Sequence, residues 1–168
     1  MTDHKVSLAA IEDFLGQKRI AMVGISRDPK STSVMLFEEL CRRGYEVIPV
    51  NPNLAEVQGR RCFARVQDIQ PPVEAALLMT SPAVTDMVVS DCVEAGIRQV
   101  WMYRGMGNGA VSENAAAFCR EHAIEVIPGE CPFMFLPGTA GAHRFHGFLH
   151  RIFGRYPRRV AITERRAA

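Results

Sequence analysis

The sequence predicts an α/β protein with a Rossmann-like three-layer sandwich and a five-stranded parallel sheet in the order 3-2-1-4-5. Short apolar runs alternate with segments whose apolar residues recur at helical spacing, which is typical of a parallel sheet covered by helices on both faces. Residues 18–53 also form the pattern strand, glycine-containing loop, helix, strand, the first half of a nucleotide-binding unit. The right-handed crossover rule makes this strand order the natural choice.

The composition is that of an ordinary globular domain. The chain has 168 residues, of which 48% are hydrophobic and 23% charged, so a single domain with a full core is expected. No apolar run is long enough to span a bilayer, and residues 1–17 contain acids where a signal peptide would be apolar. A cytoplasmic protein is therefore expected. The cysteines form no Cys-x-x-Cys pair, which favours reduced, buried thiols; they are Cys41, Cys62, Cys92, Cys119 and Cys131.

The first part of the chain contains two strands. A leading helix is expected over residues 7–15, and a first strand over 20–23 stops at Gly24. After a polar loop, a helix runs until Gly44, which suits a helix C-terminus, and a second strand over 47–50 follows.

The second part continues the alternation. A turn of helix is expected over 53–57 and a short turn over 65–69, before strands over 75–79, 99–103 and 125–127. Ser81 and Pro82 begin a helix, and Ser112 begins another that extends to His122. The Ser81 helix carries the apolar residues Val84, Met87, Val88, Cys92 and Val93 and is expected to stop near Gly96.

The loop after the first strand is suited to phosphate. A helix N-terminus offers unpaired N–H groups and a positive dipole end, and Gly24 permits close approach of the backbone. Hydroxyl donors and positive charges follow Gly24; they are Ser26, Arg27, Lys30, Ser31, Thr32 and Ser33. The alternative is that the serines only cap the helix, with Ser31 or Ser33 as the N-cap.

The residues argue against NAD as the ligand of this loop. The dinucleotide fingerprint GxGxxG requires three glycines, but Gly24 stands alone and Ser26 occupies the second position. Asn51 replaces the acid that would hold the ribose hydroxyls. A neutral residue is expected where the ribose carries a phosphate, as in NADP and coenzyme A, because a carboxylate would repel that phosphate.

Several motifs together resemble a known family. They are the Gly24 loop, Val50-Asn51-Pro52, Glu56-x-x-Gly59, Thr80-Ser81-Pro82 and Glu130-Cys131-Pro132. Over about residues 14 to 135 the chain resembles the small single-domain CoA-binding proteins, which are similar to the N-terminal Rossmann domain of the succinyl-CoA synthetase α subunit. The resemblance implies a CoA site at the C-terminal ends of the strands. It would comprise Gly24, Ile25, Ser26, Arg27, Lys30, Ser31, Ser33, Asn51, Pro52, Asn53, Thr80, Ser81, Pro82, Gly105, Cys131 and Pro132.

The function expected from this resemblance is binding of CoA or an acyl-CoA without catalysis. The second domain with its phosphorylated histidine, on which the synthetases depend, is not expected in this chain, and no GxSxG or HExxH motif occurs. The alternatives are an NADP-dependent oxidoreductase and a nucleotide-sensing adaptor. No Tyr-x-x-x-Lys pair supports the oxidoreductase. Cys131 could meet the CoA thiol, but a small buried hydrophobe is the more common role of such a cysteine.

The last segment is expected to be separate from the CoA-binding domain of residues 1–142. Residues 143–168 carry seven arginines and one glutamate, and residues 144–153 have the pattern of an amphipathic helix. This helix either covers its own sheet or forms a homodimer. His143, His146 and His150 share a polar face, where solvated side chains are favoured over a metal site. Neither nucleic acid nor a membrane is expected as a partner.

Overall fold

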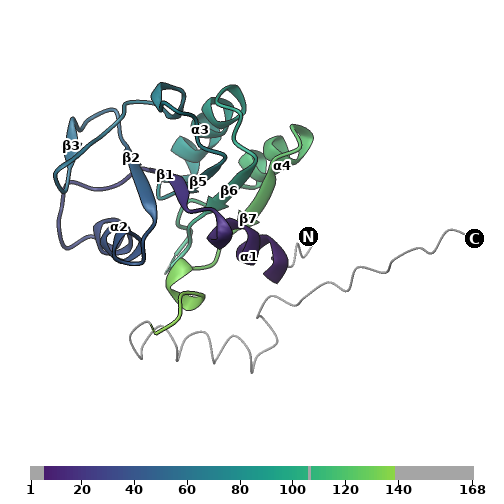
Figure 1. Cartoon of the computed structure of the whole chain (residues 1–168). Coiled ribbons are helices and arrows are strands. Elements are labelled where there is room, and N and C mark those ends of the chain that lie inside the picture. The colour runs from purple at the N-terminus through teal and green to yellow at the C-terminus, as the bar shows by residue number, and fades with distance from the viewer. Residues whose placement is uncertain (1–5, 106, 139–168) are drawn as a thin grey trace, which may run out of the picture.

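The computed structural model of the chain describes residues 6–105 and 107–138. A central parallel sheet lies between two layers of helices (Figure 1). Its strands are β1 (Arg19–Val23), β2 (Glu46–Val50), β5 (Ala75–Leu78), β6 (Gln99–Met102) and β7 (Glu125–Pro128). The helices are α1 (Leu8–Gly16), α2 (Thr32–Arg42), α3 (Pro82–Glu94) and α4 (Glu113–Glu121). The predicted α/β fold class is confirmed; the predicted tail, with its three histidines, lies outside the described residues.

The order of the strands differs from the expected one. The sheet runs β2-β1-β5-β6-β7, so the third long strand pairs with β1 and not with β2. Two observations explain this. The outer edge of β2 is occupied by Phe63, whose N–H donates to the Pro49 oxygen at 2.9 Å and whose oxygen accepts from the Asn51 N–H at 2.9 Å. All four residues of β5 are buried, which suits a central strand covered on both faces. The crossover rule fixes handedness but not the edge to which the next strand is added.

Two apolar layers hold the helices to the sheet. In β1, Ile20 and Met22 pack on the side of α1 and α2, whereas Ala21 and Val23 pack on the side of α3 and α4. This alternation follows from the two-residue period of a strand. Trp101 of β6 is fully buried, and the Phe14 ring of α1 meets it edge to face at 5.3 Å.

The expected turn of helix over 53–57 is wrong. The segment forms a hairpin of β3 (Glu56–Val57) and β4 (Arg60–Arg61). The two turn residues, Gln58 and Gly59, have φ of 50° and 72°, as a tight two-residue hairpin turn requires. The expected short turn over 65–69 is confirmed as the 3₁₀-helix η1 (Val66–Asp68).

The apolar residues of α3 are divided between its buried and its exposed sides. Val84 and Met87 are exposed, at 38% and 66%, whereas Thr85, Val89 and Cys92 are buried. The helix is apolar on more than one side, so spacing alone does not identify the inner face. Thr85 is tolerated inside because its hydroxyl donates to the Ser81 oxygen at 3.1 Å and lies 2.7 Å from Thr80 Oγ1. Over residues 6–105 and 107–138, no helix has the length and apolar character required to cross a membrane.

Candidate functional site

Gly24 lies where the chain direction across the sheet reverses. After β1 the chain moves to β2 on one side, and after β5 it moves to β6 on the other, so β1 and β5 flank the switch point where open α/β sheets bind ligands. Gly24 has φ +85°, and a Cβ there would lie 2.8 Å from Thr80 Cγ2 and 3.0 Å from the carbonyl carbon of Met79. The close packing of the β1 and β5 ends therefore requires glycine, independently of any ligand.

The serines of the β1–α2 loop mainly hold the loop in shape. Ser31 Oγ accepts from the Val34 N–H at 3.3 Å, so Ser31, one of the two serines proposed from the sequence, is the N-cap of α2. Ser33 Oγ accepts from the Ser26 N–H at 2.9 Å and is itself buried. Ser26 Oγ accepts from the Asp28 N–H at 3.0 Å. These hydroxyls are therefore already engaged within the protein.

Backbone N–H groups remain at two helix starts beside the switch point. Within the part of the chain that the structure describes, the N–H groups of Thr32 and Ser33 in α2 donate to no residue. At α3, the hydroxyl of the N-cap Ser81 makes no capping hydrogen bond, whereas Ser7 and Ser112 cap α1 and α4. Unpaired N–H groups at a helix start favour an anion, and the helix dipole adds to this preference.

Asn51 connects two of the loops. Its Nδ2 donates to the Ile25 oxygen at 2.9 Å and its Oδ1 accepts from the Asn53 N–H at 2.9 Å. Arg27 reaches across to the same place, where its Nη2 donates to the Asn53 oxygen at 3.2 Å. Among the described residues, neither Arg27 nor Lys30 forms an ion pair. These exposed positive charges thus form no ion pair with a described carboxylate, although Asp28 adds one negative charge to the same loop, where its Oδ1 accepts from the Lys30 N–H at 2.9 Å.

Tyr103 lies between the start of α2 and the loop after β7. Its hydroxyl interacts with the Cys131 thiol and with the Thr32 hydroxyl, and burial, followed by Cys131, raises the pKa of Tyr103 to about 12. Gly105 makes room for the Tyr103 ring, because a Cβ at residue 105 would lie 2.3 Å from the Tyr103 hydroxyl oxygen. The sequence did not predict Tyr103 as a site residue. Its position directly after β6, where the strand ends, is the feature that could have indicated it.

Cys131 is buried, with 8% of its surface exposed, and burial is the main cause that raises the pKa of its thiol. The thiol is therefore protonated near neutral pH and lacks the activation of a reactive cysteine. Pro132 follows as the first residue of the 3₁₀-helix η2 (Pro132–Met134). Of the sequence-predicted residues, Thr80, Ser81 and Pro82 lie at the end of β5 and the start of α3.

A comparison with models of known protein families shows to which family this chain belongs. The model of the family described as CoA binding domain matches residues 18–137. The chain belongs to this family. The resemblance to small single-domain CoA-binding proteins expected from the sequence is thereby confirmed.

Individual relatives of this CoA binding domain are of two sizes. The uncharacterized protein YneT of Bacillus subtilis (strain 168) is 30% identical over 126 residues, which are 74% of this chain and 90% of YneT. The α subunit of the ADP-forming acetate–CoA ligase II of Pyrococcus furiosus is 30% identical over 91 residues, which are 54% of this chain but 20% of that subunit. Among solved structures, a hypothetical protein from Pyrococcus horikoshii OT3 has a TM-score of 0.69 at 29% identity, covering 74% of this chain and 85% of that one.

Proposed function

We propose that this protein binds coenzyme A or an acyl-CoA at the carboxyl edge of its sheet, the edge formed by the C-terminal ends of the parallel strands, and performs no catalysis of its own. Membership of the CoA binding domain family supports the ligand. The position is supported by the starts of α2 and α3, which flank the Gly24–Thr80 contact with N–H groups that donate to no described residue. Such groups suit the pyrophosphate of CoA.

The parts of the site divide between the ligand's phosphates and its arms. We assign the phosphates to the loop around Ser26, Arg27 and Lys30 and to the N–H groups of Thr32 and Ser33. The Thr80–Pro82 segment flanks the adenosine or the pantetheine arm. The remaining sequence-predicted positions shape the edge by fixing its loops; they are Asn51, Pro52, Asn53, Gly105, Cys131 and Pro132.

The side chains of the edge also support the absence of catalysis. The pKa values of Tyr103 and Cys131 are both raised, Tyr103 to about 12, so neither group exchanges a proton readily near neutral pH. The hydroxyls of Ser31 and Ser33 are occupied by hydrogen bonds to the chain. An NADP-dependent oxidoreductase and a nucleotide-sensing adaptor are the alternatives, and the ligand comparison below distinguishes them.

The first test compares ligands. Thermal unfolding is followed with CoA, acetyl-CoA, NAD and NADP at equal concentration. CoA at about a hundred times its dissociation constant is expected to add roughly 2.7 kcal/mol to the free energy of unfolding, with a smaller effect from NAD. A larger shift with NADP would favour the oxidoreductase, and no shift with any ligand would leave an adaptor with an empty site.

The second test removes one backbone donor. Thr32 is the first residue of α2, a position that accepts proline, and the preceding Ser31 has φ −69° and ψ 149°, which suit a residue before proline. Thr32→Pro therefore deletes one N–H while keeping the helix, and Thr32→Val deletes only the hydroxyl. We expect Thr32→Pro to weaken CoA binding about tenfold, as loss of a charge-assisted hydrogen bond does, and Thr32→Val to bind like the wild type. Equal affinities in calorimetry would move the phosphate away from α2.

A further inference from the structure

The Arg104 side chain lies flat against the loop that follows β7. A Cβ on Gly129 would be 3.0 Å from Arg104 Nη2 and 3.3 Å from both Cζ and Nε. These similar distances place the face of the guanidinium over the position that a Cβ at residue 129 would occupy. The contact is possible because residue 129 has no side chain, and its φ of +108° also favours glycine.

The surface beneath Arg104 is firmly fixed. The indole N–H of the buried Trp101 donates to the Gly129 oxygen at 2.8 Å, and the Gly129 N–H donates to the Met102 oxygen at 2.9 Å. The Arg104 N–H itself donates to the Glu130 oxygen at 3.2 Å. The loop therefore presents Arg104 from a defined place at the carboxyl edge.

The guanidinium has no acceptor in the part of the chain that is described. Arg19, Arg43 and Arg65 each form an ion pair there, with Glu46, Glu39 and Asp91. Arg104 forms neither an ion pair nor a side-chain hydrogen bond with any residue of 6–105 and 107–138. A guanidinium that is packed on its face and unpaired along its N–H edge can still bind an anion with two hydrogen bonds.

We propose that Arg104 binds a carboxylate on the acyl group of an acyl-CoA ligand. The proposal rests on the proposed function. Tyr103 meets Thr32 at the start of α2, so the next residue, Arg104, lies on the β6–β7 side of the phosphate loop. Arg27, joined to Asn53, lies on the β2 side. The proposed orientation puts the nucleotide end of an extended ligand toward Arg27, where Lys30 adds a second cation, and its acyl end toward Arg104, with the pyrophosphate at α2.

The 3′-phosphate of CoA is the other anion that a guanidinium could hold. In the proposed orientation it lies at the nucleotide end, where Arg27 and Lys30, which form no ion pair with a described residue, supply positive charge. Arg104 is on the opposite side of the α2 start and has Tyr103 beside it, whose raised pKa keeps its hydroxyl uncharged. A carboxylate at the thioester end therefore fits this place better.

Calorimetry with wild type and variants tests the inference. The probes are CoA, dephospho-CoA, acetoacetyl-CoA, malonyl-CoA and succinyl-CoA. Malonyl-CoA or succinyl-CoA is expected to bind about tenfold more tightly than acetoacetyl-CoA, which is close in size to malonyl-CoA but has no carboxylate. Arg104→Gln is expected to abolish that difference and to leave the affinities for CoA and acetoacetyl-CoA unchanged. Arg104→Lys, which keeps the charge but not the planar fork, is expected to retain part of it.

The matched control is Arg98→Gln, because Arg98 precedes β6 at the opposite edge of the sheet and its side chain is likewise without an ion pair among the described residues. If wild type does not bind CoA, the proposed function fails. If CoA binds but no carboxylated ligand binds more tightly than acetoacetyl-CoA, this inference alone is overturned. It is also overturned if Arg104→Gln weakens CoA and spares dephospho-CoA, since Arg104 would then hold the 3′-phosphate.

Discussion

Asn51 Nδ2 donates a 2.9 Å hydrogen bond to the carbonyl oxygen of Ile25, which ties the end of β2 to the loop between β1 and α2. Its Oδ1 accepts from the Asn53 N–H at 2.9 Å, so both ends of the side-chain amide are used. A carboxylate offers no donor to the Ile25 oxygen. The loop geometry therefore accounts for a neutral residue here without reference to the charge of a ligand.

Asn51→Asp is expected to destabilise the fold. It removes the donor to the partly buried Ile25 oxygen and places negative charge beside it, at a cost of about 1–3 kcal/mol in the free energy of unfolding. Urea denaturation at pH 7 measures this. Asn53→Asp is the control, because Asn53 is exposed and contributes only its backbone to these hydrogen bonds; a change within about 0.5 kcal/mol is expected. Similar losses in both variants would show that the Asn51 amide is not the cause.

Gly24→Ala is expected to be far more costly than Gly44→Ala. Both glycines have φ +85°, so both variants bear the strain of a left-handed alanine, about 1–2 kcal/mol. A Cβ at Gly44 meets nothing within 4 Å, whereas at Gly24 it meets Thr80 Cγ2 at 2.8 Å and the Met79 carbonyl carbon at 3.0 Å. This overpacking adds about 1–3 kcal/mol. Chemical denaturation of the two variants isolates the steric part, and equal losses would contradict the contact.

The fold class could be predicted because it depends on local patterns. Ser31 and Ser112 cap helices at positions that the sequence indicated, and each long strand is a short apolar run. The strand order depended instead on Phe63, whose bridge to Val50 occupies the outer edge of β2. Nothing in a window around Phe63 indicates that long-range pairing. The inner face of α3 cannot be identified from spacing for a similar reason, since burial of Thr85 depends on its hydrogen bond to Ser81.

The sequence could predict which loops share the carboxyl edge, but not the roles of the residues in those loops. Loops at strand ends must meet at one edge of a parallel sheet, which is why Gly24 and Thr80 were both selected and lie in contact. Whether a serine faces a ligand or caps a helix depends on side-chain direction, which sequence does not give. Gly105 leaves room for the Tyr103 ring, and Gly129 leaves room for the Arg104 guanidinium. Because Gly129 is distant in sequence from Arg104, the second contact could not be predicted.

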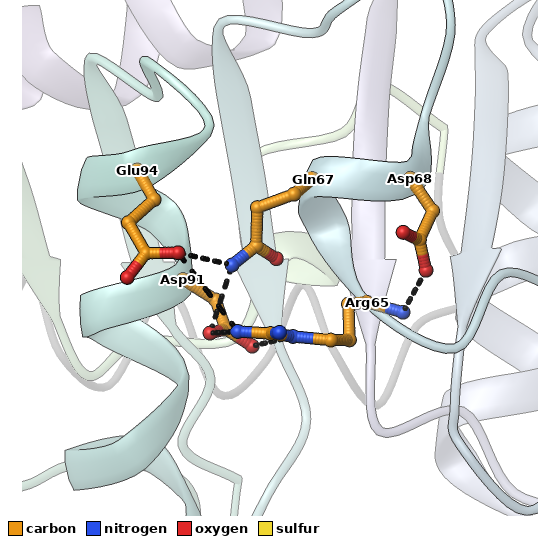
Figure 2. A network of polar contacts seen from close by, with 5 residues as sticks. All are labelled: Arg65, Gln67, Asp68, Asp91 and Glu94. Atoms are coloured by element: carbon orange, nitrogen blue, oxygen red, sulfur yellow. Dashed lines mark hydrogen bonds and ion pairs between the residues drawn. The ribbon is translucent and has the colours of Figure 1, made fainter.

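Asp91→Asn is expected to weaken the attachment of α3 to η1. Asp91 accepts from Arg65 Nη2 at 2.6 Å and from Gln67 Nε2 at 3.0 Å, and Glu94 completes the network (Figure 2). The hydrogen bond from Arg65 holds the pKa of Asp91 below its ordinary value. The lowered pKa means that the stabilisation is present above about pH 4 and is lost as the pH falls below it.

Urea denaturation between pH 3 and pH 8 is the measurement for Asp91. The wild type is expected to be more stable than Asp91→Asn at neutral pH, with the difference narrowing in acid. Glu94→Gln is the control, because Glu94 is 64% exposed and lies 3.9 Å from Arg65; screening by solvent leaves such a pair little effect. A wild-type advantage that persists unchanged at pH 3 would show that ionised Asp91 is not its source.

Arg27→Ala tests the phosphate site with the least disturbance of the fold. The Arg27 side chain is exposed, and its one hydrogen bond to a described residue, the 3.2 Å contact with the Asn53 oxygen, holds no buried group. Stability is therefore expected to change by no more than about 0.5 kcal/mol. CoA binding is expected to weaken by roughly 1.5–3 kcal/mol, the contribution of a charge-assisted hydrogen bond to phosphate.

Calorimetry of CoA and dephospho-CoA with the wild type and with Arg27→Ala locates the contact. A smaller loss of affinity for dephospho-CoA assigns Arg27 to the 3′-phosphate. Equal losses for the two ligands assign Arg27 to the pyrophosphate. Unaltered CoA affinity in a folded Arg27→Ala protein would remove Arg27 from the site and leave the loop as the start of a capped helix.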